Sequence, residues 1–579
     1  MPDPKRDAIE LLEELRDLTI LDEGDPQAFR VRAYESAKHA VEGFAGDISK
    51  LSAAELQKID GIGKSTAGKL RELFDGGRVQ KLEDLRAKHP QGIVDLMRIP
   101  GLGPKAIRRL RTELGVQSID DLRRVIAEHR IRELKGFGKT SEEKLEKSLE
   151  RMAAAGGEKR TPIAVALPLA ERLVAELAAV KGVHVAAYCG SLRRFSETVG
   201  DLDIVAAADE GAPVMETVLA LPVVDRILAQ GAGKSSFVTR RGLQVDVRVV
   251  APHQIGAALM YFTGSKGHNI KMRQRALERK LTLNEYALSE IDGGKVVASE
   301  TEEEIYAALG LPFIHPVLRE DMGEIDLAER GELPRVIDGA ALRGDFHVHT
   351  SVSGDGRSDL EEVVAAAKER GYAAVAITEH AEKLSMNGVS RDALLEQRAQ
   401  IAALQESIGP SMKILHGIEL NIGAEGELDY DDAFRRELDF CLASIHDHFD
   451  LDRAAQTRRV IRAMEDPCVR MIGHLSARML GGRPGVDLDI GAILDAAERT
   501  DTALEVNGGL PRLDVSLDVM RAARGRKVNF VLTSDAHHSR ELRRVEFAAL
   551  HASKAWLPEA RVVNAWPREQ MLAWAAARG

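Results

Sequence analysis

The spacing of apolar residues divides the chain into three regions with different predicted structure. Residues 1–157 carry short apolar segments at helical spacing between glycine turns, which predicts a mostly helical region. From Thr161, runs rich in β-branched residues such as VHVAAYCGS and LQVDVRVV alternate with helical segments, as is typical of an α/β domain. After Gly344 strands and helices alternate to the end of the chain, which predicts a parallel sheet or a barrel of βα units.

Composition and charge indicate a multidomain globular protein. At about 150 residues per domain, the 579 residues predict roughly three to five domains. The net charge of −11 is uneven, because residues 1–160 carry 31 basic against 29 acidic side chains and the remainder carries 49 against 62. A wholly basic coat is therefore excluded, but the stretch 86–151, with 16 basic against 10 acidic residues, could contact a nucleic-acid backbone.

The cysteines and the N-terminus indicate the cellular compartment. Three widely spaced cysteines, Cys189, Cys441 and Cys468, exclude a disulfide framework and a four-cysteine zinc site. The N-terminus lacks the apolar core of a signal peptide, and no apolar run approaches the ~20 residues that span a bilayer. We therefore expect a cytoplasmic protein that does not engage a membrane.

Three glycine turns in the helical region resemble one another. They are Ile59-Asp60-Gly61-Ile62-Gly63-Lys64, Ile99-Pro100-Gly101-Leu102-Gly103-Pro104-Lys105 and Leu134-Lys135-Gly136-Phe137-Gly138-Lys139. Glycine permits positive φ and close approach, so each turn can present the N–H groups of the next helix and a lysine to a phosphate. A plain helix C-cap is the alternative for any single copy. GIGKS and GAGKS are not P-loops, because Lys58 and Leu228 replace the first glycine of that motif.

Three acidic residues in the α/β region are spaced to meet. Asp201 and Asp203 are two apart on a predicted strand, so their carboxylates leave the same face, and Asp246 points outward from a later strand. If the strands are neighbours, the three carboxylates repel one another unless cations bind them. Two Mg²⁺ ions roughly 3.5–4 Å apart could then activate an attacking 3′-oxygen and neutralise a leaving pyrophosphate. Solvated acids at strand ends are the alternative.

The segment before these acids offers donors for a triphosphate. In the pattern GS-x-RR, Gly190, Ser191 and Arg194 supply backbone N–H, hydroxyl and guanidinium groups. With GDLD, the later VDVR, and YFTGS followed by Asn269, this pattern resembles family X DNA polymerases, including polymerase beta, over most of residues 20–315.

The resemblance implies a set of site residues. The implied ligands of Mg²⁺ or Mn²⁺ are Asp201, Asp203 and Asp246. The implied nucleotide contacts are Gly190, Ser191, Arg194, Tyr261, Phe262, Gly264 and Asn269. The implied DNA contacts are Gly61, Gly63, Lys64, Gly101, Gly103, Lys105, Gly136, Gly138, Lys139 and Arg273. Lys69 falls where the family's Schiff-base lyase lysine lies, although a lysine at this spacing is also a common solvated helix residue.

The sequence departs from the family pattern at two positions. Gln244 stands where polymerase beta has arginine, and Lys266 replaces an aspartate beside the nucleotide. These departures bear on fidelity and nucleotide affinity and not on the reaction.

Histidines and carboxylates end successive predicted strands in the last region, which holds ten of the 17 histidines. Asp345-Phe346-His347-Val348-His349 places two histidines on one face of a strand. The other candidates are Asp355, His380, Glu419, His446, His474, Asp535 and His537. A lone buried histidine is usually a satisfied core residue. Nine ligands at strand C-termini would share one face of a βα barrel, where Zn, Mn or Fe could support phosphoester hydrolysis.

This region resembles the PHP (polymerase and histidinol phosphatase) family over residues 341–579. The resemblance implies a distorted (β/α)7 barrel whose nine candidates hold two or three ions of Zn²⁺, Mn²⁺ or Fe. Glu379 stands where aspartate is more usual and need not be a ligand. His416, His448 and His538 match no ligand position and are interpreted as outer or surface residues.

Together the two halves resemble bacterial family X DNA polymerases with a C-terminal PHP domain. The expected domains are an 8-kDa-like helical domain (1–80), helical fingers with helix-hairpin-helix motifs (81–157), a nucleotidyltransferase palm (158–252), a thumb (253–316), a linker (317–341) and a PHP domain (342–579).

The resemblance also implies the activities and partners. We expect a monomer that binds gapped or nicked DNA and dNTPs and fills short gaps in base excision repair. The PHP domain would add 3′-5′ exonuclease and possible AP-endonuclease activity. A PHP small-molecule phosphatase fused to the polymerase, or a DNA-end-binding scaffold with weak catalysis, are the alternatives.

Overall fold

The structure is a computed structural model, which describes residues 4–577 with gaps. The gaps are 24–27, 45–47, 60, 77, 90–92, 94–95, 97–98, 100–101, 135, 140, 144, 147–148, 150–159 and 385–386. The chain forms two compact units, Met1–Lys159 and Arg160–Gly579. No helix in these described ranges is long and apolar enough to cross a membrane.

The N-terminal unit is helical, as its glycine-punctuated pattern predicts. Its helices are α1 (Pro4–Glu23), α2 (Phe29–Gly43), α3 (Ala53–Leu56), α4 (Lys64–Gly76), α5 (Gln80–Lys88), α7 (Pro104–Leu114) and α8 (Ile119–Ala127). They share one core, in which Leu12, Leu56 and Leu110 are fully buried. Gly61 has a φ of +87°, and a Cβ there would lie 2.9 Å from the Ser36 carbonyl oxygen, so this turn requires glycine.

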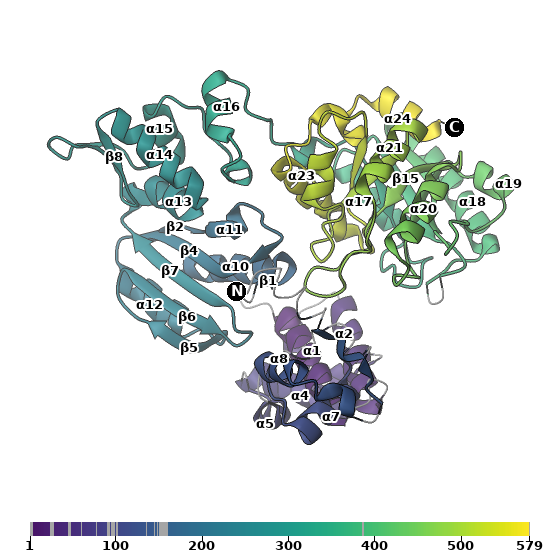
Figure 1. Ribbon diagram of the computed structural model, residues 1–579, viewed down its shortest axis with the longest axis horizontal. Coiled ribbons are helices and arrows are strands. Elements are labelled where there is room, and N and C mark those ends of the chain that lie inside the picture. Colours follow the sequence, from purple (N-terminus) through teal and green to yellow (C-terminus); the bar gives the residue numbers. More distant parts are fainter. Residues whose placement is uncertain are drawn as a thin grey trace. The chain divides into compact units, whose positions relative to one another are not determined.

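The second unit begins with a five-stranded sheet in the order β2-β4-β7-β6-β5 (Figure 1). Its strands are β2 (Val183–Tyr188), β4 (Asp201–Ala208), β5 (Val224–Ala229), β6 (Lys234–Thr239) and β7 (Gln244–Val250), and only β4 and β7 pair in parallel. One face packs on α10 (Ile163–Ala178) and α12 (Gly211–Leu219). On the other face Val205, Ala207 and Val250 pack on Ala258 of α13 (Ile255–Thr263). Alternation along β4 and β7 therefore puts Asp201, Asp203 and Asp246 on the α13 side.

A small helical and stranded region follows the sheet. It contains α14 (Lys266–Glu278), β8 (Leu281–Leu283), β9 (Leu288–Glu290), β10 (Val296–Ala298), α15 (Glu302–Ala308) and α16 (Glu324–Arg330). Helix α16 lies within the stretch 317–341, where an irregular linker is predicted. The prediction of irregular structure is wrong for α16, which folds as a helix because Ile325 and Ala328 are buried in the core shared with the sheet. A helix of two turns is too short to show a clear apolar period.

The C-terminal barrel consists of parallel strands in sequence order, each followed by helix on the outside (Figure 1). The strands are β11 (Gly344–Val348), β12 (Ala374–His380), β13 (Lys413–Asn421), β14 (Phe440–Ser444), β15 (Val469–Gly473), β16 (Ala503–Asn507) and β17 (Phe530–Thr533). The helices include α17 (Leu360–Glu369), α18 (Arg391–Ile408), α20 (Arg453–Met464), α21 (Ile490–Thr500), α22 (Leu517–Ala522), α23 (Val545–Lys554) and α24 (Arg568–Ala576). A parallel bridge between Val348 and Ala536 nearly closes the seven strands into a barrel. Their carboxyl ends therefore face one common rim.

Candidate active sites

The three predicted acids of the five-stranded sheet lie on adjoining strands. In the register of β4 and β7, Asp203 pairs with Asp246 and Asp201 pairs with Gln244. Asp246 accepts hydrogen bonds from Ser236 Oγ and, at 2.9 Å, from Gln244 Nε2, and Lys234 Nζ lies 3.8 Å from its Oδ1. Three carboxylates thus share one face of the sheet, as the sequence predicts.

Burial and like charge act together on the central acid. Burial, with the neighbouring Asp201 and Asp246, raises the pKa of Asp203 to about 7. Gly190 has a φ of +61°, and a Cβ there would lie 2.6 Å from Asp203 Oδ2. Only glycine lets the backbone pass this close to the acid. The arrangement favours a cation, which would relieve the repulsion between carboxylates.

The predicted nucleotide residues gather beside these acids. Gly190 and Ser191 begin the short helix α11 (Gly190–Arg193), and Cys189 N donates to the Asp203 carbonyl oxygen at 2.7 Å. Arg194 follows, and its Nη1 donates to the Thr263 carbonyl oxygen at 2.5 Å and its Nε to Glu320 at 3.1 Å. A cationic guanidinium therefore stands next to the acid face.

Helix α13 carries the predicted aromatic pair on the same side. The rings of Tyr261 and Phe262 meet edge to face at 5.1 Å, and the Arg248 guanidinium lies 4.4 Å from the Phe262 ring centroid. Asn269 Nδ2 donates to the Tyr261 carbonyl oxygen at 2.6 Å. Gly264, with a φ of +66°, ends the helix beside Arg194 Nη1.

The predicted DNA contacts fall in both units. In the N-terminal unit Lys64 is exposed at the start of α4, and Gly103 directly precedes α7. Gly136 has a φ of +89°, Gly138 precedes a helical segment, and Lys139 is an exposed residue 3.8 Å from Glu143. Lys266, which departs from the family pattern, and Arg273, a predicted DNA contact, are both exposed on α14. Gly101 and the side chain of Lys105 lie outside the described residues.

The predicted lyase lysine has a defined environment. Lys69 Nζ donates to Ser65 Oγ at 2.7 Å and lies 5.7 Å from the Tyr34 ring centroid. Burial lowers the pKa of Lys69, helped by Lys81 and Arg30 and opposed by Glu72. A lowered pKa increases the neutral fraction that attacks a carbonyl, so the geometry is compatible with Schiff-base chemistry.

All nine predicted ligands of the barrel converge at its carboxyl rim. Glu419 lies at the centre, with Nε2 of His474, His446 and His347 at 3.0, 3.2 and 3.4 Å from its Oε1. His380 Nδ1 lies 2.8 Å from the other oxygen of Glu419. Further approaches include His349 Nε2 to Asp535 at 3.5 Å, and His380 and His537 Nε2 to Asp355 at 3.3 and 3.5 Å.

The donor chemistry of this cluster fits metal ions. Four groups of three ligand atoms lie within 4.8 Å of one another, namely His349/His380/His537, His347/His474/Asp535, His347/His349/Glu419 and His380/Glu419/His446. Within the described part of the chain, His347 Nε2, both ring nitrogens of His349, and His474 Nδ1 are buried without a hydrogen-bond partner. Orphaned buried nitrogens are costly unless a cation or water satisfies them. Mixed imidazole and carboxylate ligands suit Zn, Mn or Fe.

The charges within the cluster also favour a cation. Burial lowers the pKa of His349 well below its usual value, helped by His380 and His537, which leaves the neutral ring that can ligate a metal. Burial would raise the pKa of Glu419, but His446 and His347 hold it well below its usual value. His349 therefore offers a neutral ring beside the ionised Glu419, whereas the neighbouring carboxylates raise the pKa of His347 and His380, whose protons a bound cation would displace.

Buried polar residues that the sequence did not single out orient these ligands. Glu505 accepts from His347 Nδ1 and from Thr533 Oγ1, each at 2.6 Å, and Asn421 Oδ1 lies 2.7 Å from His446 Nδ1. Such partners fix the ring and raise the basicity of a metal-binding histidine. The available signal was one carboxylate, Glu505, in the otherwise apolar strand ALEV.

Glu379 is an anchor of the first ligand loop. Its carboxylate accepts from Thr350 N at 3.1 Å, Ser353 N at 3.2 Å and Gln397 Nε2 at 2.6 Å, and also from the hydroxyl groups of Thr350 and Ser353. These bonds hold the segment that carries His349 and Asp355. Glutamate in place of aspartate thus serves the loop, in keeping with the prediction that it need not be a ligand.

Comparison with known proteins identifies the family of the chain. Family models match residues 3–79 (helix-hairpin-helix domain), 93–151 (SAM-like helix-hairpin-helix tandem), 258–320 (DNA polymerase beta thumb) and 345–508 (PHP domain). The "DNA polymerase/3′-5′ exonuclease PolX" of Bacillus subtilis (strain 168) is 35% identical over 565 residues, 97% of each chain. The chain belongs to the PolX family. The predicted family and fold class are therefore confirmed.

Two further relatives each match one part of the PolX architecture. DNA polymerase lambda of Rattus norvegicus is 25% identical over 331 residues, 50% of this chain and 52% of that protein. A probable phosphatase of Shewanella sediminis is 30% identical over 244 residues, 41% of this chain and 94% of that protein. A nucleotidyltransferase and a PHP phosphoesterase are thus joined in one enzyme of this family.

Three histidines outside the ligand cluster of the barrel have other surroundings. His416 accepts from Arg398 Nε at 3.3 Å and is buried, so it is not a surface residue. His448 is half exposed, and His538 accepts from Arg540 N at 3.2 Å at the start of a short 3-10 helix. None belongs to a candidate ligand group among the described residues.

Arg512, which the sequence did not single out, borders the ligand cluster of the barrel. Its Nε lies 3.6 Å from Asp535 Oδ2, and its Nη1 is buried without a hydrogen-bond partner among the described residues. A guanidinium beside such a cluster can bind a phosphate oxygen.

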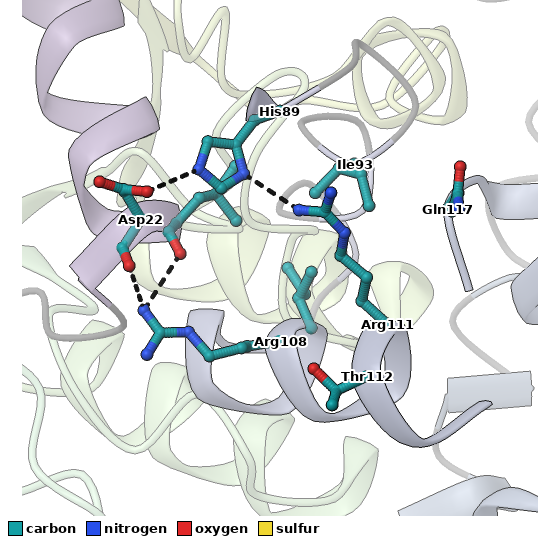
Figure 2. A pocket seen from close by; sticks show the side chains of 9 residues that line it. Asp22, His89, Ile93, Arg108, Arg111, Thr112 and Gln117 are labelled. Carbon is teal, nitrogen blue, oxygen red and sulfur yellow. Dashed lines mark hydrogen bonds and ion pairs between the residues drawn. The ribbon is translucent and has the colours of Figure 1, made fainter. Parts of the chain in front are cut away.

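The N-terminal unit also contains a cavity of about 360 Å³ between α1 and α7 (Figure 2). His89 bridges Asp22, at 3.3 Å from its Nε2, and Arg111, at 3.5 Å from its Nδ1. Arg108 donates to the carbonyl oxygens of Leu21 and Asp22. These polar groups face one another in the cavity wall, so they tie the end of α1 to α7.

Proposed function

We propose that this PolX-family enzyme fills short gaps in DNA during base excision repair and trims 3′ ends with its PHP domain. The pairing of Asp203 with Asp246 in one register, beside Arg194, carries the proposal for the polymerase. The convergence of five histidines on Glu419, with the other predicted ligands beside them, supports the phosphoesterase, which would process 3′ ends and incise abasic sites.

In the polymerase site each group of residues has its own proposed role. Mg²⁺ or Mn²⁺ held by Asp201, Asp203 and Asp246 would activate the primer 3′-oxygen for attack on the α-phosphorus and stabilise the leaving pyrophosphate. The Gly190–Ser191 turn and Arg194 would donate to the triphosphate. The remaining roles, on the nucleotide sugar and base edge, are proposed for Tyr261, Phe262 and Asn269.

In the PHP site the ligand set would hold two or three ions of Zn²⁺, Mn²⁺ or Fe, which supply a hydrolytic nucleophile near neutral pH. Glu505 and Asn421 orient His347 and His446 toward that set. Arg512 stands where it could donate to the phosphate at the DNA 3′ end.

The helix-hairpin-helix turns and Arg273 would grip gapped or nicked DNA, and dNTPs are the polymerase substrates. Backbone N–H groups and lysines at such turns bind phosphates without reading sequence. Lys69 is proposed as the lyase nucleophile at an abasic site, on the basis of its lowered pKa and its contact with Ser65.

The test is a time course on 5′-labelled one-nucleotide-gapped DNA with Mg²⁺ or Mn²⁺, with and without dNTPs. Asp246→Ala should abolish extension and keep 3′ shortening, whereas His347→Ala/His349→Ala should do the reverse. Extension by Asp246→Ala at the wild-type rate would contradict the polymerase assignment. Full resection by the double variant, after removal of contaminating nucleases, would contradict the nuclease assignment.

A second function for the PHP domain is favoured by one observation. The probable phosphatase of Shewanella sediminis is matched over 94% of its length by this part of the chain. Hydrolysis of a small phosphate monoester, with no shortening of a DNA 3′ end in the same assay, would move the proposal to that substrate class.

A further inference from the structure

The proposed triphosphate ligand Arg194 is held by a lysine from the PHP domain. Lys554, the last residue of α23, donates from Nζ to the Arg194 carbonyl oxygen at 2.8 Å and pairs with Glu320. Glu320 in turn accepts from Arg194 Nε at 3.1 Å. One carboxylate thus lies between two cations that come from distant parts of the sequence but from one compact unit, Arg160–Gly579.

Further contacts hold segment 194–197, which begins with Arg194, against the PHP domain. Arg478 Nη2 donates to Glu197 at 2.7 Å, and the same arginine donates from Nε to the Arg512 carbonyl oxygen at 2.9 Å. The ring of Phe195 stacks on Phe547 at 6.0 Å. Segment 194–197 is therefore held from the PHP side at three of its residues, Arg194, Phe195 and Glu197.

The charges of Lys554, Glu320 and Arg194 indicate that this contact does more than pack two surfaces together. Lys554 is 4% exposed, and burying an ammonium is costly unless it is paired. Burial lowers the pKa of Lys554, and Glu320 opposes that shift. Glu320 alone would neutralise Arg194, whereas the trio Arg194, Glu320 and Lys554 keeps a net charge of +1 for an anionic triphosphate.

We propose that the PHP domain positions the nucleotide-binding arginine of the polymerase, with Lys554 as the positioning residue acting through Glu320. The proposal rests on the proposed role of Arg194 in binding the triphosphate. It makes the PHP domain a part of the dNTP site, independent of its own metal chemistry. Removing the lysine charge should leave Arg194 compensated by Glu320, and so weaken dNTP binding more than it slows the chemical step.

The experiment measures single-turnover incorporation into one-nucleotide-gapped DNA over a range of dNTP concentrations, with the full-length chain. Lys554→Met should raise the apparent dNTP dissociation constant about tenfold, the size of one lost charge-assisted hydrogen bond, with the maximal rate little changed. Lys554→Met/Glu320→Gln restores the net charge and should restore the affinity. Arg370→Met is the matched control, because it also removes one positive charge from the PHP side, where Arg370 pairs with Glu546 of the same helix α23.

Melting temperature and 3′ shortening are recorded for each variant to show that the fold and the PHP site are intact. An unchanged dissociation constant in Lys554→Met, or a loss that the double variant does not rescue, would overturn the proposal. If Lys554→Met does not fold, Glu320→Gln alone tests the proposal. This variant removes the negative charge beside Arg194, so weaker dNTP binding would contradict the charge argument. Failure of the proposed function is distinct: wild type would not extend, or Arg194→Met would bind dNTP normally.

Discussion

The two candidate metal sites of this chain are built in opposite ways. The polymerase acids lie on an open sheet face, where Asp201 is exposed and Asp203 and Asp246 are partly buried. The PHP ligands lie at a barrel rim, where His347, His349 and Glu419 are fully buried and Glu505 fixes one ring from behind. The first site consists of three carboxylates, whereas the second combines imidazole rings with acids.

This difference indicates two relations between metal and protein. Carboxylates that keep part of their surface in solvent can exchange ions with it, so ions can arrive with the nucleotide and leave with pyrophosphate. Buried nitrogens without partners are costly, so the PHP site should keep its ions as part of the folded structure. The open site is thus built for exchange and the buried site for retention.

The largest expected effect separates the sites by activity. Asp203→Ala should reduce nucleotide incorporation roughly 10³-fold, because metal charge stabilisation is worth several kcal/mol at 1.4 kcal/mol per tenfold. The same change should leave 3′ shortening and metal content unaltered. Asp225→Ala, on the exposed strand β5 of the same sheet, is the control and should extend normally. Equal incorporation by the two variants would remove the acid face from the reaction.

Metal removal should affect stability at only one of the sites. If the PHP ions exceed their dissociation constant about 1,000-fold, their loss costs about 4 kcal/mol of unfolding free energy. Prolonged chelation should therefore lower the Tm of the wild type, with metal content followed by elemental analysis. His347→Ala/His349→Ala should start from the lower Tm and respond little to chelator. If the Tm of the wild type stayed the same after complete loss of metal, both sites would be shown to exchange their ions.

Acid should lower the stability of the protein through His551, which lies where the polymerase region and the PHP domain meet. Burial lowers the pKa of His551 to about 4, and its Nε2 donates to the Val515 carbonyl oxygen at 2.9 Å. The unfolded chain takes up this proton near pH 6.5 and the folded chain does so only near pH 4. Stability is therefore lost as pH falls through that window, by up to about 3 kcal/mol.

The measurement is denaturant unfolding between pH 7 and pH 4, with His551→Gln as the comparison. Glutamine keeps a donor without the titration, so its stability should fall less steeply over this range. Parallel curves for the two proteins would exclude His551 as the source of the acid sensitivity.

How far the sequence could predict these features depends on the range of the interaction. Alternation in GDLD and VDVR placed the three acids on one face, and the βα repeat put the histidines at strand ends, because both follow from local periodicity. The pairing of Lys554 with Arg194 spans 360 residues and leaves no local pattern. Glu505 looked like an isolated polar residue in a strand, since nothing in ALEV shows that it faces His347. Helix α16 was missed because it has too few turns.

The smallest expected effect tests how far the buried site depends on its surroundings. Glu505→Gln keeps the shape of the side chain but removes the negative charge that faces His347 Nδ1, so the histidine becomes a weaker ligand. Loss of such a partner typically weakens metal binding about 10- to 100-fold. Competition with a metal-binding dye should show this change, while nucleotide incorporation stays at the wild-type level. Asp501→Asn, at a carboxylate that pairs with Arg470 on a neighbouring element of the barrel, is the control. If Glu505→Gln binds metal as tightly as this control, retention must come from the ligands themselves, and the buried site would differ from the open one only in its number of donors.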